Sequence, residues 1–167
     1  LLSANDLTPA SIDARLDVIS PLIGCVAWRT IQFTPIGTIF LSSDKQVYLL
    51  TLDGGLIAIG SNIFSNRPEV NGIEDIPASS NTLPWAVYHN GFYKLFIPAA
   101  SGTYNTIQFW LDCTHFHQHP RTGFYGPWYG PMMGQALAHG VVQNGSGDDG
   151  SLMVGEAKAS TGGYVYQ

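Results

Sequence analysis

Through most of this chain, apolar residues recur at every second position, and Gly, Pro, Asn and Asp interrupt the runs at short intervals. This period of two places apolar side chains on one face of a β-strand, whereas a helix would need a period of 3.6. Between residues 27 and 60 the runs AWRTIQF, GTIFLSS, QVYLLTL and GLIAIG alternate with turn sequences such as Thr34-Pro35, Ser43-Asp44 and Asp53-Gly54-Gly55. The pattern predicts an all-β chain that begins with one antiparallel meander.

The segment SIDARLDVIS, residues 11–20, allows two interpretations. Thr8-Pro9 in front of it is an acceptable N-cap and first-turn pair for a helix. However, Ile12, Ala14 and Leu16 alternate strictly with charged residues, as in a half-buried strand. The alternation favours the strand.

The strand pattern is lost over residues 61–83 and restarts at residue 84. PWAVYHNGFYKLFIP contains two alternating runs around Asn90-Gly91, a dipeptide typical of two-residue hairpins because both turn positions need positive φ. NTIQFWLDC and GFYGPWYGPM predict two further strands, and the pattern starts again at residue 136. The 61–83 segment is therefore predicted to be a long connection between two strand units.

The predicted hairpin turns near Gly37, Asn90-Gly91 and Asp149-Gly150 lie roughly 50 to 60 residues apart, a period typical of blades or arrays. Four short antiparallel strands in each unit indicate β-propeller blades. We therefore predict a first blade, a long connecting loop, a second blade and the start of a third, over residues 1–60, 61–83, 84–135 and 136–167. A closed propeller needs at least about four blades, so an incomplete propeller is expected, completed by another segment or chain.

Composition excludes some classes of function. Charged residues make up only 11% of the chain and the net charge is −5, which argues against a face that binds nucleic acid. Pro21, Gly24 and Arg29 interrupt the most apolar run, so no membrane span is predicted, and no signal peptide is recognisable. Cys25 and Cys113 are too few for a disulfide scaffold and are expected to be free, buried thiols.

CTHFHQHPRTGFYGPWYG, residues 113–130, raises the possibility of a metal site, since it opens with donors at alternate positions: Cys113, His115, His117 and His119. On one strand, the ends of this run would be about 20 Å apart. Zinc ligands must lie about 2.0 to 2.3 Å from a single ion, so the four cannot share one. A site would need one neighbouring pair and further donors, for which the candidates are His89, His139 and Asp112. The favoured interpretation is a loop at a contact between subunits, without a metal.

Other candidate chemistry is weaker. Asp148-Asp149-Gly150 with Asn144 lacks the spacing of an EF-hand and predicts a solvated turn. Nothing marks any two carboxylates as a glycosidase pair among the candidates Glu69, Glu74, Asp75 and Asp112. The tryptophans could form a platform for a sugar, but packing in the core is favoured for Trp28, Trp85, Trp110 and Trp128. We predict no catalytic residue, cofactor or metal, and hence no enzyme.

Two stretches carry a resemblance to a known group of proteins. LTPASIDARLDVISPLIGCVAWRTIQFTPIGTIFLSSDKQVYLL, and AVYHNGFYKLFIPAASGTYNTIQFWLDCT with GPWYGP behind it, are similar to β-propeller virion proteins of tailed bacteriophages, of the tail nozzle, tail tube or stabilising type. The resemblance covers most of residues 8–167 and rests on patterns of strands and turns. The chains of that group are longer, so it implies that this sequence is a fragment.

This resemblance implies a structural role in a phage tail or tail tip, in a symmetric ring. The expected location is the virion, assembled in the host cytoplasm, and the expected partners are further copies of the chain and neighbouring virion proteins. The alternative is a glycan-binding or glycan-cleaving propeller, receptor-binding or sialidase-like, with a host glycan as its ligand.

Overall fold

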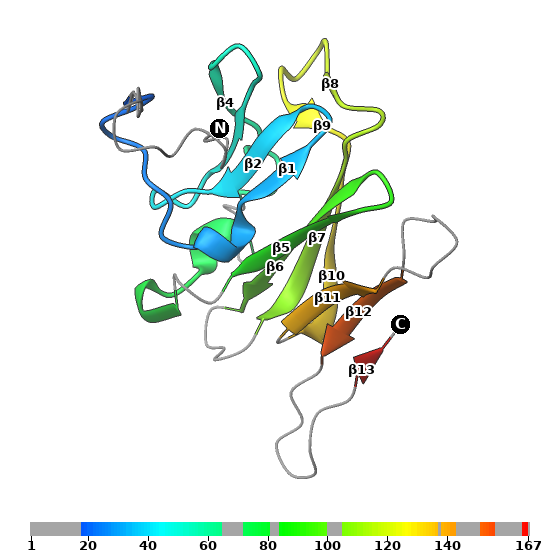
Figure 1. Ribbon diagram of the computed structural model, residues 1–167. Coiled ribbons are helices and arrows are strands. Elements are labelled where there is room, and N and C mark those ends of the chain that lie inside the picture. The colour runs from blue at the N-terminus through cyan, green and yellow to red at the C-terminus, as the bar shows by residue number, and fades with distance from the viewer. Residues whose placement is uncertain are drawn as a thin grey trace, which may run out of the picture.

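The computed structural model describes residues 18–64, 72–80, 84–99, 105–136, 138–142, 151–155 and 165–166. These residues form short antiparallel strands and three 3-10 turns, without an α-helix among them, so the expected all-β class is confirmed (Figure 1). This described part of the chain contains no helix with the length and hydrophobicity that a membrane crossing requires. Most of SIDARLDVIS lies outside the described residues.

The first sheet is a four-stranded meander in the order β1-β2-β3-β4. Its strands are β1 (Gln32–Thr34), β2 (Gly37–Leu41), β3 (Val47–Leu50) and β4 (Leu56–Ala58). Burial alternates along β2 and β3, as the sequence period predicts: Ile39 and Leu49 face the core, whereas Phe40 and Tyr48 stack on the outer face with their ring centroids 6.0 Å apart.

The prediction of one strand over AWRTIQF is wrong in its first half. Residues Trp28–Thr30 form the 3-10 turn η1, and β1 begins only at Gln32. The hydroxyl of Thr30 donates to the carbonyl of Ala27, at 2.7 Å, and accepts from the backbone N–H of Leu41, at 2.9 Å. Such side chain–backbone hydrogen bonds compete with strand pairing, so the chain turns before it joins the sheet.

The second sheet has the order β10-β7-β6-β5. Its strands are β5 (Trp85–His89), β6 (Phe92–Pro98), β7 (Asn105–Asp112) and β10 (Trp128–Ala136). The predicted hairpin is confirmed, because His89 pairs with Phe92 and the turn residues Asn90 and Gly91 have φ values of 51° and 80°. The chain leaves this sheet after β7 and returns to the β7 edge as β10.

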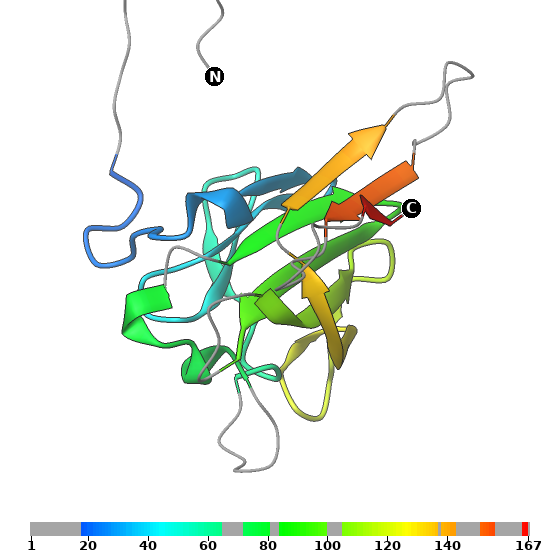
Figure 2. The same ribbon diagram turned by 90° about the horizontal axis from the view of Figure 1, so that it is seen from below.

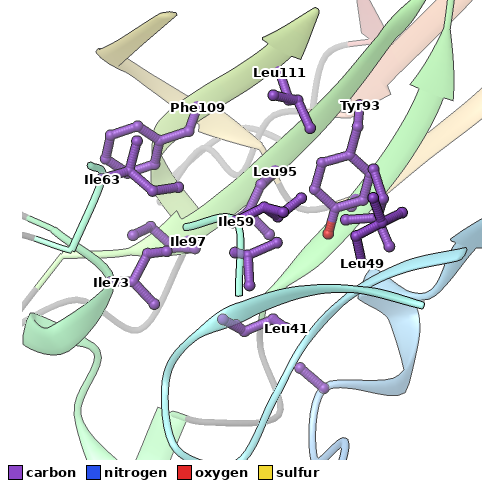
Figure 3. Close-up of a cluster of buried hydrophobic side chains, with 14 of the residues drawn as sticks. Leu41, Leu49, Ile59, Ile63, Ile73, Tyr93, Leu95, Ile97, Phe109 and Leu111 are labelled. Carbon is purple, nitrogen blue, oxygen red and sulfur yellow. The ribbon is translucent and has the colours of Figure 1, made fainter. Parts of the chain in front are cut away.

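The main core lies between the inner faces of the first two sheets (Figure 3). The segment 61–83, predicted as a long connection, contributes to this core. Its described part contains the short 3-10 helices η2 (Ile73–Asp75) and η3 (Ala78–Ser80), and its residues Ile63, Ile73 and Ile76 are buried. From β6, the fully buried Tyr93 crosses the core and donates its hydroxyl to the carbonyl of Thr30, at 3.1 Å. That hydrogen bond joins the second sheet to η1.

A single side chain also joins the two sheets at their neighbouring edges. The amide of Gln32 donates to the carbonyl of Ala86, at 3.0 Å, and accepts from the N–H of Tyr88, at 3.4 Å. These two backbone groups lie on the edge of β5 that points away from β6. Gln32 therefore occupies the place of a neighbouring strand and covers an edge that would otherwise be open to pairing.

The third sheet, β11 (Ala138–Val142), β12 (Ser151–Gly155) and β13 (Val165–Tyr166), is also antiparallel. In both ribbon views it lies on the side of the second sheet that faces away from the first sheet (Figures 1 and 2). On that face of the second sheet, Trp85 and Phe96 stack with their ring centroids 3.8 Å apart and are almost fully buried. The three sheets thus follow one another in space in chain order.

Candidate functional site

The histidine-rich stretch forms an excursion from the second sheet. It was predicted as a loop, but it contains a two-stranded ribbon of β8 (His117–Gln118) and β9 (Tyr125–Gly126), at the upper right of Figure 1. The tip is closed by hydrogen bonds from the N–H of His119 to the carbonyl of Phe124, at 2.8 Å, and from the N–H of Gly123 to the carbonyl of His119, at 2.9 Å. Because the tip is bonded internally, the ribbon presents its side chains in a defined arrangement.

Asp112 organises the start of this excursion. Its Oδ1 accepts hydrogen bonds from the N–H groups of Thr114 and His115, at 2.8 and 3.0 Å, and its Oδ2 lies 2.8 Å from Nδ1 of His115. The hydrogen bond from the His115 ring, helped by the two backbone N–H groups, lowers the pKa of the Asp112 carboxyl below its usual value. The charged Asp112 carboxylate thus stabilises the turn that begins the excursion, by accepting hydrogen bonds from Thr114 and His115.

Replacing Asp112 by asparagine is expected to make the free energy of unfolding depend less on pH in the acidic range. A carboxyl whose pKa is lower in the folded chain stabilises it above the unfolded pKa of about 3.9, and this contribution is lost as pH falls through the lower, folded pKa. Urea unfolding from pH 7 down to pH 2 would measure this. Wild type and Asp112→Asn should differ at pH 7 and converge at the acid end; a constant difference would contradict the assignment.

The next two histidines hold the ribbon through their Nδ1 atoms. Nδ1 of His117 lies 2.8 Å from the carbonyl of His115, which requires a proton on Nδ1 and leaves Nε2 as an acceptor in the neutral ring. Nδ1 of His119 accepts from the N–H groups of Arg121 and Thr122, at 3.3 and 3.2 Å, so its proton is on Nε2. The neighbouring rings therefore offer one acceptor and one donor.

The donors of the run considered as a candidate metal site, Cys113, His115, His117 and His119, do not meet. Within the described part of the chain, no three His, Cys, Asp or Glu side chains are grouped to hold one ion. Cys113 is buried, whereas the side chain of His115 is 76% exposed. Burial raises the pKa of Cys113 to about 11, which opposes the thiolate that a metal would bind, and both cysteines are free thiols, with Cys25 only half-buried. The side chain of His139, and residues 143–150 with the suggested calcium loop, lie outside the described side chains.

A cavity of about 270 Å³ opens beside the ribbon. Its lining residues are Asn62, His117, His119, Thr122, Phe124, Tyr125, Gly126, Pro127 and Trp128. The indole N–H of Trp128 donates to the carbonyl of Ile59, at 2.9 Å, and its ring contacts that of Tyr93 edge-on. Tyr125, which also lines the cavity, stacks on Phe116 with the ring centroids 5.6 Å apart. Packing against the core thus fixes two of the aromatic walls.

The sequence flagged only part of this cavity. His117, His119 and Trp128 are candidates from the sequence. Phe124 is suggested only by the aromatic content of GFYGPWYG, and nothing in the sequence points to Asn62. Asn62 comes from the segment predicted as a connection, and only the tertiary structure brings it to the ribbon. His117, His119 and Trp128 thus meet at one concave surface.

The other candidates are dispersed. Asp75 accepts a hydrogen bond from the N–H of Gly72, at 2.9 Å, as part of the η2 turn, and Glu69 lies outside the described residues. The tryptophans form no common platform: Trp85 is buried, Trp110 lies under the ammonium of Lys94 on the outer face of the second sheet, and Trp28 is exposed on η1. Comparisons with protein-family models, with curated proteins and with solved structures found no significant match to this chain.

Proposed function

We propose that this protein is a structural subunit that assembles with further copies of itself through residues 18–33. The observation that carries the proposal is the position of exposed apolar side chains. Seven of the ten large exposed apolar residues in the described part of the chain fall in this segment: Val18, Ile19, Leu22, Val26, Trp28, Ile31 and Phe33. Apolar exposure concentrated in this way is typical of protein interaction surfaces.

The same segment also borders an apolar hollow. A cavity of about 390 Å³ separates residues 18–25 from the outer face of the first sheet, and its apolar lining includes Ile19, Ile31, Phe40 and Leu50. A surface that carries both protruding apolar side chains and an apolar hollow can pair with a second copy of itself, as the interfaces of symmetric oligomers do. The low charged fraction of 11% supports such packing.

The particle is proposed on the resemblance of the sequence. A phage tail or tail tip, in which β-propeller blades form a symmetric ring, accounts for three successive antiparallel sheets and for a weakly charged surface. In this proposal each sheet is a blade, and neighbouring copies supply the remaining blades of the ring.

Replacing Phe33 by serine is expected to shift the protein from oligomer to monomer. Phe33 is 81% exposed, so this change should leave the thermal midpoint nearly unchanged while it removes apolar area from the interface. The matched control is Leu52→Ser, at a residue that is 90% exposed on the β3–β4 turn and outside the segment.

Sedimentation velocity and negative-stain imaging of the full chain would measure the result. We expect ring-shaped oligomers for wild type and for Leu52→Ser, and a lower mass for Phe33→Ser. A wild-type protein that stays monomeric at high concentration, or equal effects of the two substitutions, would refute the proposed interface.

A further inference from the structure

The cavity beside the β8–β9 ribbon combines aromatic walls with polar groups that carry no fixed charge. Its described lining includes the rings of Phe124, Tyr125 and Trp128, and none of these described lining residues is Lys, Arg, Asp or Glu. Transferring a charged ligand out of water into such a site would be costly, because no described residue of the lining compensates its charge. The cavity therefore favours a neutral ligand with an apolar face.

The polar groups of the lining match hydroxyl groups. Because their Nδ1 atoms are bonded within the ribbon, His117 offers an acceptor and His119 a donor at Nε2, and the amide of Asn62, also in the lining, offers both. A hydroxyl both donates and accepts, so adjacent hydroxyls on a ring can satisfy such a mixed set. A ligand with donors alone or acceptors alone would leave part of this set unpaired.

The aromatic groups of the lining match the C–H face of the same ring. The N–H of Trp128 is already bonded to Ile59, so its indole contributes apolar surface to the cavity. Phe124 is 46% exposed and adds a second aromatic side chain at the ribbon tip. A pyranose has an apolar C–H face and a rim of hydroxyls, and we infer that this cavity binds a neutral hexopyranoside.

Size and rigidity agree with a single ring. The volume of about 270 Å³ lies just below the roughly 300–1,000 Å³ of sites for drug-sized ligands. The side-chain amide of Gln118 donates to the carbonyl of Gly123, at 2.9 Å, and helps to hold the ribbon tip. Binding therefore does not have to order the ribbon first, which removes one cost of association.

Saturation-transfer NMR with the full chain would test this inference, with methyl glycosides of glucose, galactose, mannose and N-acetylglucosamine as probes. We expect at least one of them to bind with a Kd of about 1 mM, as is reasonable for a single small ring. Phe124→Ser and Asn62→Ala, which act from different segments of the chain, should each weaken binding by about tenfold. Tyr129→Ser is the matched control, because Tyr129 is 49% exposed and does not line the cavity.

The outcomes separate this inference from the proposed assembly, on which it does not depend. Phe33→Ser should keep full glycoside binding even if it abolishes oligomers. Failure of all four glycosides to bind wild type would overturn the inference, as would binding that both cavity substitutions leave unchanged. Adenosine serves as a probe of another class: if it binds in the cavity and no glycoside does, the assigned ligand class is wrong. Thermal midpoints of the variants show whether they fold. If Phe124→Ser does not fold, Asn62→Ala alone is sufficient for the test.

Discussion

Replacing Gly37 by alanine is expected to destabilise the protein by about 3 kcal/mol or more. Gly37 opens β2 with φ at +135°, a region that residues with a side chain rarely adopt. An added Cβ would also lie 2.4 Å from the carbonyl oxygen of Leu50 on β3, so the backbones of the paired strands would have to separate. Urea unfolding of wild type and variant at pH 7 would measure the loss.

Gly54→Ala provides the comparison that isolates the steric contribution. Gly54 also has a positive φ, +88°, but an added Cβ there would meet nothing within 4 Å. This variant should therefore lose only about 1 kcal/mol, the cost of the backbone conformation. Equal losses for the two variants would contradict the argument that close approach of β3 excludes a side chain at Gly37.

Replacing Thr30 by valine is expected to cost about 2–3 kcal/mol, although the two side chains have nearly the same volume. Thr30 is fully buried, and its hydroxyl connects the carbonyl of Ala27 to the N–H of Leu41. Valine would leave the N–H of Leu41 without its partner in the interior, and the penalty for a buried, unsatisfied donor exceeds the net value of a hydrogen bond.

Thr38→Val is the control for this second prediction. Thr38 lies half-buried on the outer face of β2, beside Phe40, where valine suits a strand. Its substitution should change the free energy of unfolding by less than about 0.5 kcal/mol. Thermal or urea unfolding of both variants gives the comparison, and a loss for Thr30→Val no greater than for Thr38→Val would show that the buried hydroxyl is not needed.

The proposed assembly surface and the inferred sugar cavity occupy different parts of the chain. The surface consists of residues 18–33, whereas the cavity is built on the β8–β9 ribbon with Asn62. A subunit that assembles through one region and binds a carbohydrate through another would unite the two functions that the sequence left as alternatives. The independent substitutions Phe33→Ser and Phe124→Ser test each role without disturbing the other.

Local sequence was sufficient for most of the strands. The period of two predicts β2, β3 and β7, because along each of these strands buried side chains alternate with side chains that are only partly buried. Asn90-Gly91 was sufficient for its hairpin, because the positive φ values that the turn needs are a property of those two residues. These features depend on neighbours in the chain, so the sequence alone determined them.

Tertiary structure decided the features that depend on partners far along the chain. AWRTIQF alternates like a strand, yet η1 forms because the hydroxyl of Thr30 reaches Leu41, eleven residues away. In the same way, Gln32 reads as an ordinary polar strand residue, but it covers the edge of β5, 54 residues further on. Asn62 and Trp128 face one cavity only because the ribbon returns beside the end of the first sheet. A periodic pattern records which side chains are buried, whereas the pairing of buried polar groups and the walls of a cavity depend on which distant segments meet, and the pattern carries no record of that.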